Sequence, residues 1–334
     1  MKTDGLQGVK LDGKQVAPST QQELDGHIRQ QSAARTRRSF LVAGAVALGG
    51  YGLYEWIATS KQIGRQERPL RKAFEINAAI ARGIFREAGL APTYPLQKAA
   101  GDLRFNGNFG LREALVPESW RLQLVGAENP EKFPQYSRDV TAWQYKYTES
   151  APAEPQPAQD DSKGVVAPQK QIARKRGREE AGESMSGIKQ GTPGLLLKMS
   201  DLEGFPHVDL VTEFKCIEGW SQIVQWGGIR LADLIAAYPP AKSKNGKLPR
   251  YVYMETPDGD YYCGYDLSAC THPQSLLVYS MGGRPINQYH GAPLRLHMPI
   301  KYGYKQIKRI GLIAYTDLRP DDYWTKLGYD WYAG

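Results

Sequence analysis

Cysteine and histidine are scarce in this chain of 334 residues, which contains three cysteines and five histidines. Three cysteines exclude a dense disulfide framework, and the lack of a C-x-x-C pair argues against a structural zinc site. The sequence also lacks a C-x-x-C-H haem attachment motif and a dinucleotide-binding glycine fingerprint. If the chain carries out redox chemistry, the electrons must therefore come from a partner.

Charge of one sign does not dominate either. The 43 lysines and arginines are scattered among 35 acidic residues and 20 tyrosines, for a formal net charge of +8. No known nucleic-acid motif accompanies them, so we expect no nucleic-acid partner. With 41% hydrophobic residues, the chain can bury a substantial core in one large domain or two smaller ones.

Long hydrophobic runs are limited to one stretch, TRRSFLVAGAVALGGYGLYEWI (36–57). Its apolar part of about 15 residues is short for a membrane span of about 20. Arg37 and Arg38 directly precede it, a pattern that resembles a twin-arginine export signal. No convincing A-x-A cleavage site follows, so we expect an uncleaved anchor that holds a periplasmic protein to the inner membrane. The alternative is a buried glycine-rich helix.

The chain is predicted to have three parts. Residues 1–60 form the tail with the signal or anchor, and residues 61–100 form a linker with an amphipathic helix between Leu70 and Phe85. Residues 101–334 form the main domain. An insertion in that domain, near 144–192, is rich in Pro, Ala, Glu and Lys without an apolar period, and is predicted to be disordered.

From Phe205 onward the pattern changes to short strands separated by glycine turns. Turns are expected at Asp258-Gly259 and Gly282-Gly283, and one helix is expected over 229–238. Strands are predicted at 207–216, 250–256, 294–300 and 307–316. The fold class is therefore α+β, mixed and mostly β.

Cys216 lies in EFKCIEGWSQIVQW (213–226), between a charged stretch and two tryptophans. One interpretation is a buried structural thiol at the end of a strand. A catalytic nucleophile would need a nearby histidine, and Glu218 would instead raise the pKa of the thiol. A soft metal avoids this difficulty because coordination itself deprotonates the sulfur. A metal that brings most of its own ligands would need only this one thiolate.

Several segments then carry a family resemblance. KCIEGWSQIVQWGGIRLADLI, YVYMET and THPQSLLVYSMGGRPINQYHGAPLRLHMPIKYGYKQIKRI, in this order, resemble the molybdopterin-binding domain of the sulfite oxidase superfamily. The nearest branch is the periplasmic methionine sulfoxide reductase catalytic subunit. The likeness covers 101–126 and about 200–316. It implies a molybdenum–molybdopterin cofactor with Cys216 as the protein ligand of the metal and Glu218 as a catalytic neighbour.

The resemblance also implies a set of residues that bind the pterin and its phosphate: Asn106, Phe109, Thr256, His290, Arg295, Gln306, Ile307 and Lys308. The guanidinium of Arg295, the ammonium of Lys308 and main-chain N–H groups around Gln306 would complement a phosphate dianion. Taken singly, each cation is more simply a surface ion pair worth less than about 1 kcal/mol. His290 replaces an asparagine of the family and is expected to titrate near neutral pH.

The residues after the cysteine bear on the substrate. Sulfite oxidases carry an arginine there to bind an anion, whereas Gly219, Trp220 and Ser221 follow Glu218 here. A carboxylate near the metal is expected to repel sulfite, and Trp220 offers an apolar wall to a neutral molecule. The simpler interpretation of Trp220 and Trp226 is core packing.

We therefore expect an exported molybdenum oxidoreductase that reduces a small neutral S- or N-oxide, such as methionine sulfoxide, by oxygen-atom transfer. Its electrons would come from a membrane haem or quinol-linked subunit. The alternatives are a sulfite-type dehydrogenase that runs oxidatively and a non-catalytic, membrane-tethered module of the same fold. The spacing of Cys263 and Cys270 permits a disulfide without requiring one, and His297 receives no role.

Overall fold

The computed structural model describes residues 50–334 apart from 64–65, 85–88, 102, 112 and 149–187. The chain divides into two units, of which the first comprises residues 1–63 and 67–70 and the second comprises 64–66 and 71–334. The arginine pair of the predicted signal lies outside the described residues. The same holds for residues 149–187 of the predicted insertion.

In the first unit, residues 50–58 form a helix at the end of the predicted hydrophobic run. Its large side chains Tyr51, Leu53, Tyr54 and Trp56 are all exposed. Within the described part of the chain, no helix combines the length and the apolar character needed to cross a bilayer.

The predicted amphipathic helix is confirmed as α2 (Arg68–Ile84). Two short paired strands, β1 (Gln62–Ile63) and β2 (Gln66–Glu67), precede it. Apolar residues recur at three- and four-residue steps and give the helix one apolar side. Ala78 on that side is buried, whereas Ile76 and Ile80 are exposed.

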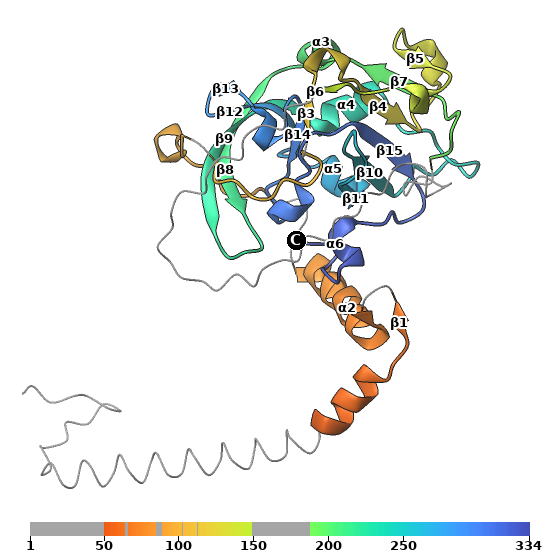
Figure 1. The fold of residues 1–334 in the computed structure, drawn as a ribbon, viewed down its shortest axis with the longest axis vertical. Helices are drawn as coiled ribbons and strands as arrows, with labels where there is room; N and C mark the ends of the chain where they lie inside the picture. Colours follow the sequence, from red (N-terminus) through yellow and green to blue (C-terminus); the bar gives the residue numbers. More distant parts are fainter. Residues whose placement is uncertain (1–49, 64–65, 85–88, 102, 112, 149–187) are drawn as a thin grey trace, which may run out of the picture. The chain divides into compact units, whose positions relative to one another are not determined.

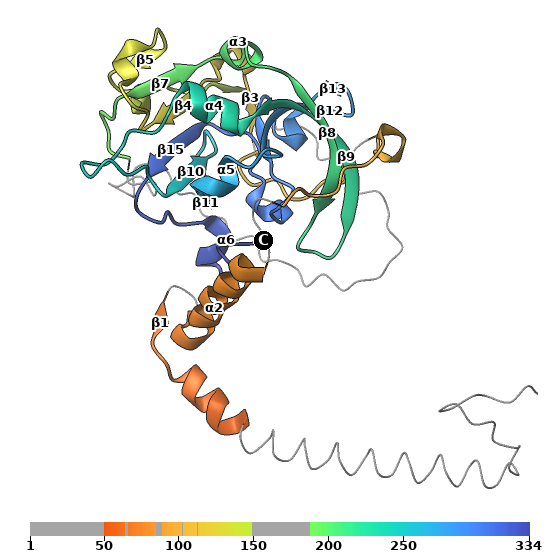
Figure 2. The same ribbon diagram turned by 180° about the vertical axis from the view of Figure 1, so that it is seen from behind.

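A six-stranded sheet forms one half of the second unit. In spatial order its strands are β11 (Tyr262–Asp266), β10 (Tyr251–Glu255), β15 (Leu312–Thr316), β4 (Leu122–Val125), β7 (Gly194–Leu197) and β5 (Tyr136–Ser137). Neighbouring strands are antiparallel except for β15 and β4, which are parallel. Figures 1 and 2 show β15, β10 and β11 side by side.

A five-stranded sheet forms the other half and carries the candidate site. Its strands are β13 (Arg284–Pro285), β12 (Leu276–Met281), β9 (Ser221–Arg230) and β8 (Val208–Lys215), and β14 (Arg295–His297) also pairs with β12. Strands β8 and β9 form one long curved hairpin (Figure 1). Gly228 lets β9 approach β12, because a Cβ there would lie 2.0 Å from the carbonyl oxygen of Leu277.

The remaining elements are short. Strand β3 (Ala114–Leu115) pairs with β6 (Tyr147–Thr148). The helices are α3 (Met199–Glu203), α4 (Leu231–Ala237), α5 (Leu267–Cys270) and α6 (Tyr323–Lys326), and the 3-10 turns are η1 (Leu96–Lys98), η2 (Pro117–Ser119), η3 (Pro130–Lys132), η4 (Val140–Ala142), η5 (Gln288–His290) and η6 (Gly303–Lys305). The main core takes apolar side chains from both sheets, among them Leu124, Ile229, Leu277 and Ile313.

Most predicted elements are present, but several boundaries were wrong. The strand expected over 307–316 begins only at Leu312, because Arg309 has a left-handed φ of 50° that interrupts the extended backbone. The helix expected over 229–238 begins at Leu231, since the two residues before it end β9. The predicted insertion was drawn too wide, because β6 and residues 188–192 belong to the described structure.

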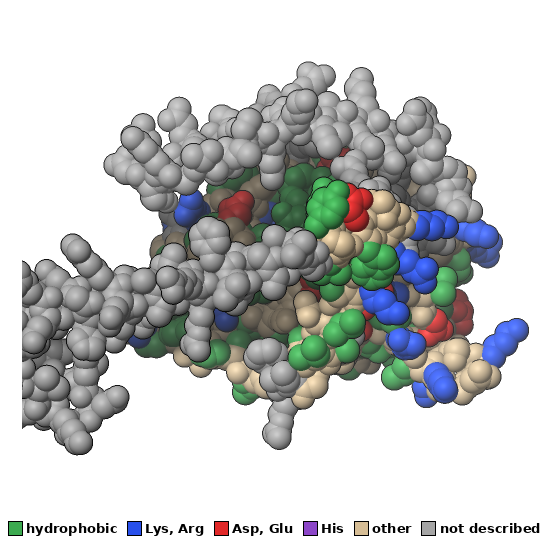
Figure 3. Space-filling view, turned by 90° about the horizontal axis from the view of Figure 1, so that it is seen from below, with side chains coloured by type: hydrophobic (Ala, Val, Ile, Leu, Met, Phe, Trp, Pro, Cys, Tyr) green, Lys and Arg blue, Asp and Glu red, His purple; other side chains and the backbone are tan. Residues whose placement is uncertain are grey.

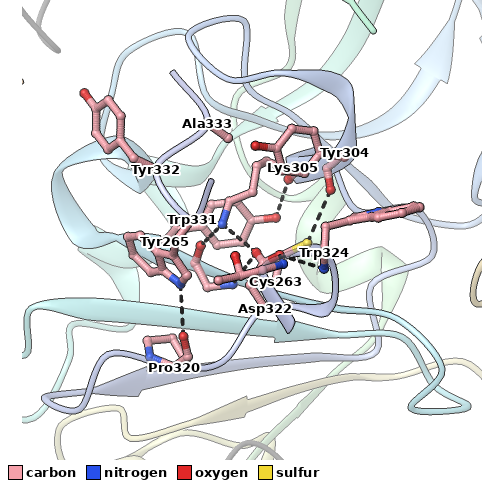
Figure 4. A network of polar contacts seen from close by, with 12 residues as sticks. Cys263, Tyr265, Tyr304, Lys305, Pro320, Asp322, Trp324, Trp331, Tyr332 and Ala333 are labelled. Carbon is pink, nitrogen blue, oxygen red and sulfur yellow. Dashed lines mark hydrogen bonds and ion pairs between the residues drawn. The ribbon is translucent and has the colours of Figure 1, made fainter. Parts of the chain in front are cut away.

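The C-terminal segment is held to the six-stranded sheet by a buried ion pair (Figure 4). Lys305 Nζ lies 2.6 Å from Asp322 Oδ2, and the two side chains are 1% and 0% exposed. Lys305 also donates a hydrogen bond to the carbonyl of Gly264, and Asp322 caps α6 by accepting from the N–H of Trp324. Because Lys305 ends η6, this pair fixes the chain just before residues 306–308. Cys263, nearby in Figure 4, is a free thiol, as is Cys270, so no disulfide joins them.

Candidate active site

Cys216 lies in the tight turn that joins β8 to β9. The Cys216 N–H donates to the carbonyl of Trp220 at 2.9 Å, and the Gly219 N–H donates to the carbonyl of Cys216 at 3.2 Å. Gly219 has a φ of 90°, a left-handed value that glycine adopts without strain. The turn therefore holds the thiol at the end of the hairpin, where the side chain is 8% exposed.

Glu218 and Trp220 share this turn. The indole Nε1 of Trp220 donates to Glu218 Oε2 at 3.1 Å, and Glu218 itself is exposed. Burial raises the pKa of the Cys216 thiol, and the charge of Glu218 acts in the same direction. The protein alone thus keeps the sulfur protonated, which disfavours a nucleophile and leaves metal coordination as the way to a thiolate.

Arg295 is a fully buried cation at the start of β14. Its Nη1 donates to the carbonyl of His290 at 3.1 Å, and its guanidinium carbon lies 5.0 Å from the ring centroid of Trp226. Burial lowers the pKa of Arg295 to about 9. Among the described residues, Arg295 has no carboxylate within ion-pair distance. A buried arginine normally has an anionic partner, so an anion is expected to bind here.

Lys308 is a second buried cation, 6% exposed. Its Nζ donates to the carbonyls of Asn106, Gly107 and Tyr289 at 3.2, 2.9 and 3.3 Å. Burial lowers the pKa of Lys308 well below its ordinary value, the charge of Arg295 lowers it further, and Cys216 raises it. These charge effects fall off with distance, so Lys308 links the buried cations to the cysteine turn.

Unpartnered polar atoms test whether the predicted cofactor fits. Arg295 Nε and Nη2, His290 Nδ1 and Asn106 Oδ1 are buried without a hydrogen-bond partner, and so is Trp226 Nε1. Buried donors left unpaired are costly and uncommon, so they point to a bound polar group. These four side chains, one of them cationic, suit the phosphate and pterin of the expected cofactor. The donor set of this chain therefore fits that group.

His290 departs from expectation in its charge. Burial lowers its pKa to about 3, with Arg295 and Lys308 acting in the same direction. The prediction that His290 titrates near neutral pH was wrong, because two cations and little water surround it. Its turn is packed directly on the 308–309 segment: Gly291 has a φ of 101°, and a Cβ there would lie 2.7 Å from Lys308 Cβ.

Phe109 and Thr256 lie together in a second group. Thr256 Oγ1 donates to Asp258 Oδ1 at 2.5 Å and accepts from the N–H of Tyr261 at 3.1 Å, so its hydroxyl closes the turn between β10 and β11. The ring of Phe109 stacks on Tyr261 with centroids 5.9 Å apart. The loop that carries Asn106 also carries Phe109, so it connects this group to the buried cations.

Gln306 and Ile307 are placed inside the domain. The Gln306 N–H donates to the carbonyl of Gly303 at 3.0 Å, so this one donor is already engaged. That main-chain N–H groups around Gln306 bind the phosphate stays a prediction. Gln306 Oε1 accepts a hydrogen bond from His297 Nδ1 at 2.8 Å. Ile307 is fully buried in the main core, so only its backbone can face a cofactor.

Three residues that the sequence left without a role support this arrangement. His297 is fully buried between Gln306 and Thr212, whose Oγ1 lies 2.6 Å from His297 Nε2. Trp226 stacks on His297 at a centroid distance of 4.3 Å and carries Arg295 on its ring. Arg309 binds the carbonyls of Gly110 and Glu113 and the side chain of Gln288, which joins the 105–113 loop to η5. The cluster of basic residues at 305–309 was the sequence signal that could have indicated a role for Arg309.

Arg104 bears on the argument about substrate charge. Its guanidinium carbon lies 5.2 Å from the ring centroid of Trp220, the tryptophan that binds Glu218. The sequence places no arginine soon after Cys216, but the fold brings one from another segment. The repulsion of sulfite by Glu218 stays a prediction, and Arg104 is a second charge beside it.

One mixed sheet and one antiparallel sheet thus present a cysteine beside buried cations that have no carboxylate partner among the described residues. This donor set suits an anionic cofactor. Residues 189–324 match the oxidoreductase molybdopterin binding domain. The matched segment is thus a domain of this kind, which places it in the sulfite oxidase superfamily, and the match is to an oxidoreductase domain. The resemblance seen in the sequence is thereby confirmed.

Relatives with related names share this segment. YedZ1 of Azospira oryzae, named as a protein-methionine-sulfoxide reductase subunit, is 36% identical over 139 residues, which cover 41% of this chain and 50% of that one. The protein-methionine-sulfoxide reductase catalytic subunit MsrP of Campylobacter jejuni is 33% identical over 153 residues, or 42% of this chain and 52% of that one. The chain thus spans about half the length of these relatives.

One solved structure is similar at a greater distance. The sulfane dehydrogenase SoxCD of Paracoccus pantotrophus aligns with a TM-score of 0.34 and 18% identity, covering 38% of this chain and 36% of that one. At that score the likeness carries no argument.

Proposed function

We propose that the protein reduces a neutral S- or N-oxide, such as methionine sulfoxide, by oxygen-atom transfer at a molybdenum–molybdopterin cofactor. The observation that carries the proposal is the pairing of Cys216, a lone thiol at the end of a hairpin, with buried cations that lack carboxylate partners. When bound, this cofactor supplies a metal that accepts and releases one oxygen atom as it changes oxidation state by two electrons. The names of the MsrP relatives support the choice of substrate.

Different residues of this chain would bind the metal, bind the rest of the cofactor and supply a proton. Cys216 would provide the thiolate ligand, and Arg295, Lys308, Asn106 and His290 would hold the phosphate and pterin. Net reduction of a sulfoxide takes two electrons and two protons and yields a sulfide and water. Glu218 is exposed beside the Cys216 turn, so it is placed to supply a proton to the oxygen that leaves the substrate.

Export and the electron partner complete the proposal. We infer that the chain is exported by the twin-arginine route and stays at the periplasmic face of the inner membrane, because Arg37 and Arg38 precede a glycine-rich apolar run. The electrons would come from a membrane haem or quinol-linked subunit, since the sequence has no haem motif and no dinucleotide fingerprint of its own.

The test begins with molybdenum quantification on the purified full chain, followed by turnover with a reduced dye and methionine sulfoxide. The same preparation is given sulfite and an artificial acceptor. Faster reduction of the neutral oxide is expected. A loaded protein that oxidises sulfite efficiently and ignores neutral oxides would establish the oxidative alternative instead, and one that contains no molybdenum would contradict the cofactor assignment.

Cysteine variants test the metal ligand within the same experiment. Cys216→Ser should abolish turnover and alter the paramagnetic spectrum of the metal, because a hard alkoxide would replace a soft thiolate. Cys270→Ala changes another buried thiol, in α5, and should retain both the spectrum and the turnover. An unchanged spectrum in Cys216→Ser would contradict the ligand assignment.

A further inference from the structure

The segment that carries Arg104 is fixed against the cysteine turn from several directions. Leu103 is buried in the same apolar cluster as Cys216 and Trp226. The Arg104 N–H donates to Gln222 Oε1 at 2.8 Å, at the start of β9. Two residues further on, the carbonyl of Asn106 accepts from Lys308. The backbone of Arg104 is therefore placed by the fold, and its guanidinium lies over Trp220 as a consequence.

Trp220 connects two opposite charges. Its indole N–H donates to Glu218, and the guanidinium of Arg104 lies 5.2 Å from the centre of its ring. The ring also packs against Phe214, with centroids 5.8 Å apart, so its position is supported from the core side. An arginine stacked on an aromatic ring keeps its full charge while its orientation is restricted.

The other charges of the hairpin balance each other. Lys215 Nζ lies 3.7 Å from Glu213 Oε2, and Ser221 donates to Glu213 Oε1 at 2.5 Å. Among the described residues, the charges that contact Trp220 at the end of the turn are those of Glu218 and Arg104, of opposite sign. A substrate that approaches Cys216 passes a carboxylate and a guanidinium together.

We propose that Arg104 is a specificity-determining residue that offsets Glu218 and admits oxides carrying one negative charge as well as neutral ones. The inference rests on the proposed function for the substrate, and it concerns the same site. Without Arg104, the carboxylate of Glu218 would act alone and anionic oxides would be disfavoured. Both groups are exposed, so water and salt screen the effect, and a change of about three- to tenfold is expected at low ionic strength.

Fluorescence quenching tests the local charge without any need for activity. Arg104→Gln should lower the quenching constant of the anion iodide and leave that of neutral acrylamide unchanged, whereas Arg104→Lys should keep the wild-type value. The difference should disappear when Trp220→Phe is added. Arg121→Gln is the matched control, because the guanidinium carbon of Arg121 lies 4.9 Å from the ring centroid of Trp143. Any change in iodide quenching that Arg121→Gln causes should persist when Trp220→Phe is added.

A pair of substrates that differ by one charge tests specificity. N-acetylmethionine sulfoxide is a monoanion at neutral pH, and its methyl ester is neutral. Arg104→Gln should raise the KM of the anion about three- to tenfold with little change in kcat, and should alter the KM of the ester less than about twofold. In half-molar salt, Arg104→Gln and the wild type should have the same KM for the anion. At low salt, Arg104→Lys should have the wild-type KM. Arg121→Gln should leave both KM values unchanged.

Several outcomes would overturn the proposal. Equal iodide quenching in wild type and Arg104→Gln would show that the guanidinium sets no charge at Trp220. If Arg104→Gln changes the quenching constants of acrylamide and iodide alike, or the KM of both substrates alike, then Arg104 has a structural role instead. If the loaded protein reduces neither substrate, the proposed function fails, and the quenching experiment still decides the role of Arg104.

Discussion

Arg295 and Lys308 show at the scale of single residues how the domain is prepared for an anion. Each is buried, each has a pKa lowered by burial, and neither has a carboxylate partner among the described residues. Two like charges in one place destabilise a protein unless a ligand of opposite charge compensates them. The same groups would therefore contribute little to stability alone and much to cofactor binding.

His297 gives a prediction at this scale. Burial holds its pKa at about 3, far below its ordinary value of about 6.5. In the unfolded chain it takes up a proton near pH 6.5, and in the folded protein it does not. Stability should therefore fall as the pH drops from about 7 toward 3. Between pH 7 and pH 5.5 this histidine should account for about 1 kcal/mol.

Chemical denaturation at several pH values measures this effect. In His297→Gln the loss of stability between pH 7 and pH 5.5 should be smaller than in the wild type by about 1 kcal/mol. An unchanged pH dependence in His297→Gln would mean that this ring binds its proton equally well in the folded and the unfolded chain.

The sequence predicted the chemical groups of the site better than their contacts. Cys216, Arg295 and Lys308 stand out because each carries a chemistry that the cofactor needs. In the structure, Trp226 contacts Arg295 and lies in the same apolar cluster as Cys216. Arg104 and Trp220 are separated by more than a hundred residues, so no local pattern reveals that they touch. His297 looks like one more core residue until its bonds to Thr212 and Gln306 are seen.

At the scale of elements, strands with alternating apolar residues were predicted well. The predicted strands at 207–216 and 250–256 correspond to β8 and β10, since alternation along a half-buried strand is a local property. The stretch 307–311 has the same apolar character but is not a strand. There Lys308 and Arg309 bind loop carbonyls, and these long-range contacts override the local preference.

The buried pair Lys305–Asp322 gives a prediction for these elements. Asp322→Asn keeps an oxygen that can cap α6 but removes the charge that compensates Lys305. Leaving one partner of a buried pair uncompensated costs about 3–5 kcal/mol. Thermal or urea unfolding should show a loss of this size. The protein should also lose cofactor affinity, because Lys305 directly precedes the 306–308 segment.

The neighbouring residue offers a matched control. Asp321 lies 2.8 Å from Lys326, but both side chains are largely exposed. Asp321→Asn should change the free energy of unfolding by less than about 1 kcal/mol. Similar effects of the two substitutions would show that the C-terminal segment is not held by the buried pair.

At the scale of the whole molecule, the formal net charge of +8 comes from 43 lysines and arginines against 35 acidic residues. On the face shown in Figure 3, the described Lys and Arg side chains lie among acidic and hydrophobic ones.

Export is the prediction that belongs to the whole chain. The twin-arginine route carries proteins that have already folded, which suits an enzyme whose cofactor must be inserted before it leaves the cytoplasm. Its receptor reads Arg37 and Arg38 as a pair, and lysine keeps the charge without the guanidinium. Replacing both with lysine should leave the protein in the cytoplasm, with its molybdenum content intact. Arg35→Lys changes an arginine just outside the pair and should preserve export.

Protease access in spheroplasts distinguishes the two outcomes, because only exported protein is cleaved from outside. Normal delivery of the double-lysine variant would show that this segment is not a twin-arginine signal, while the assignment of Cys216 and its cofactor would stand.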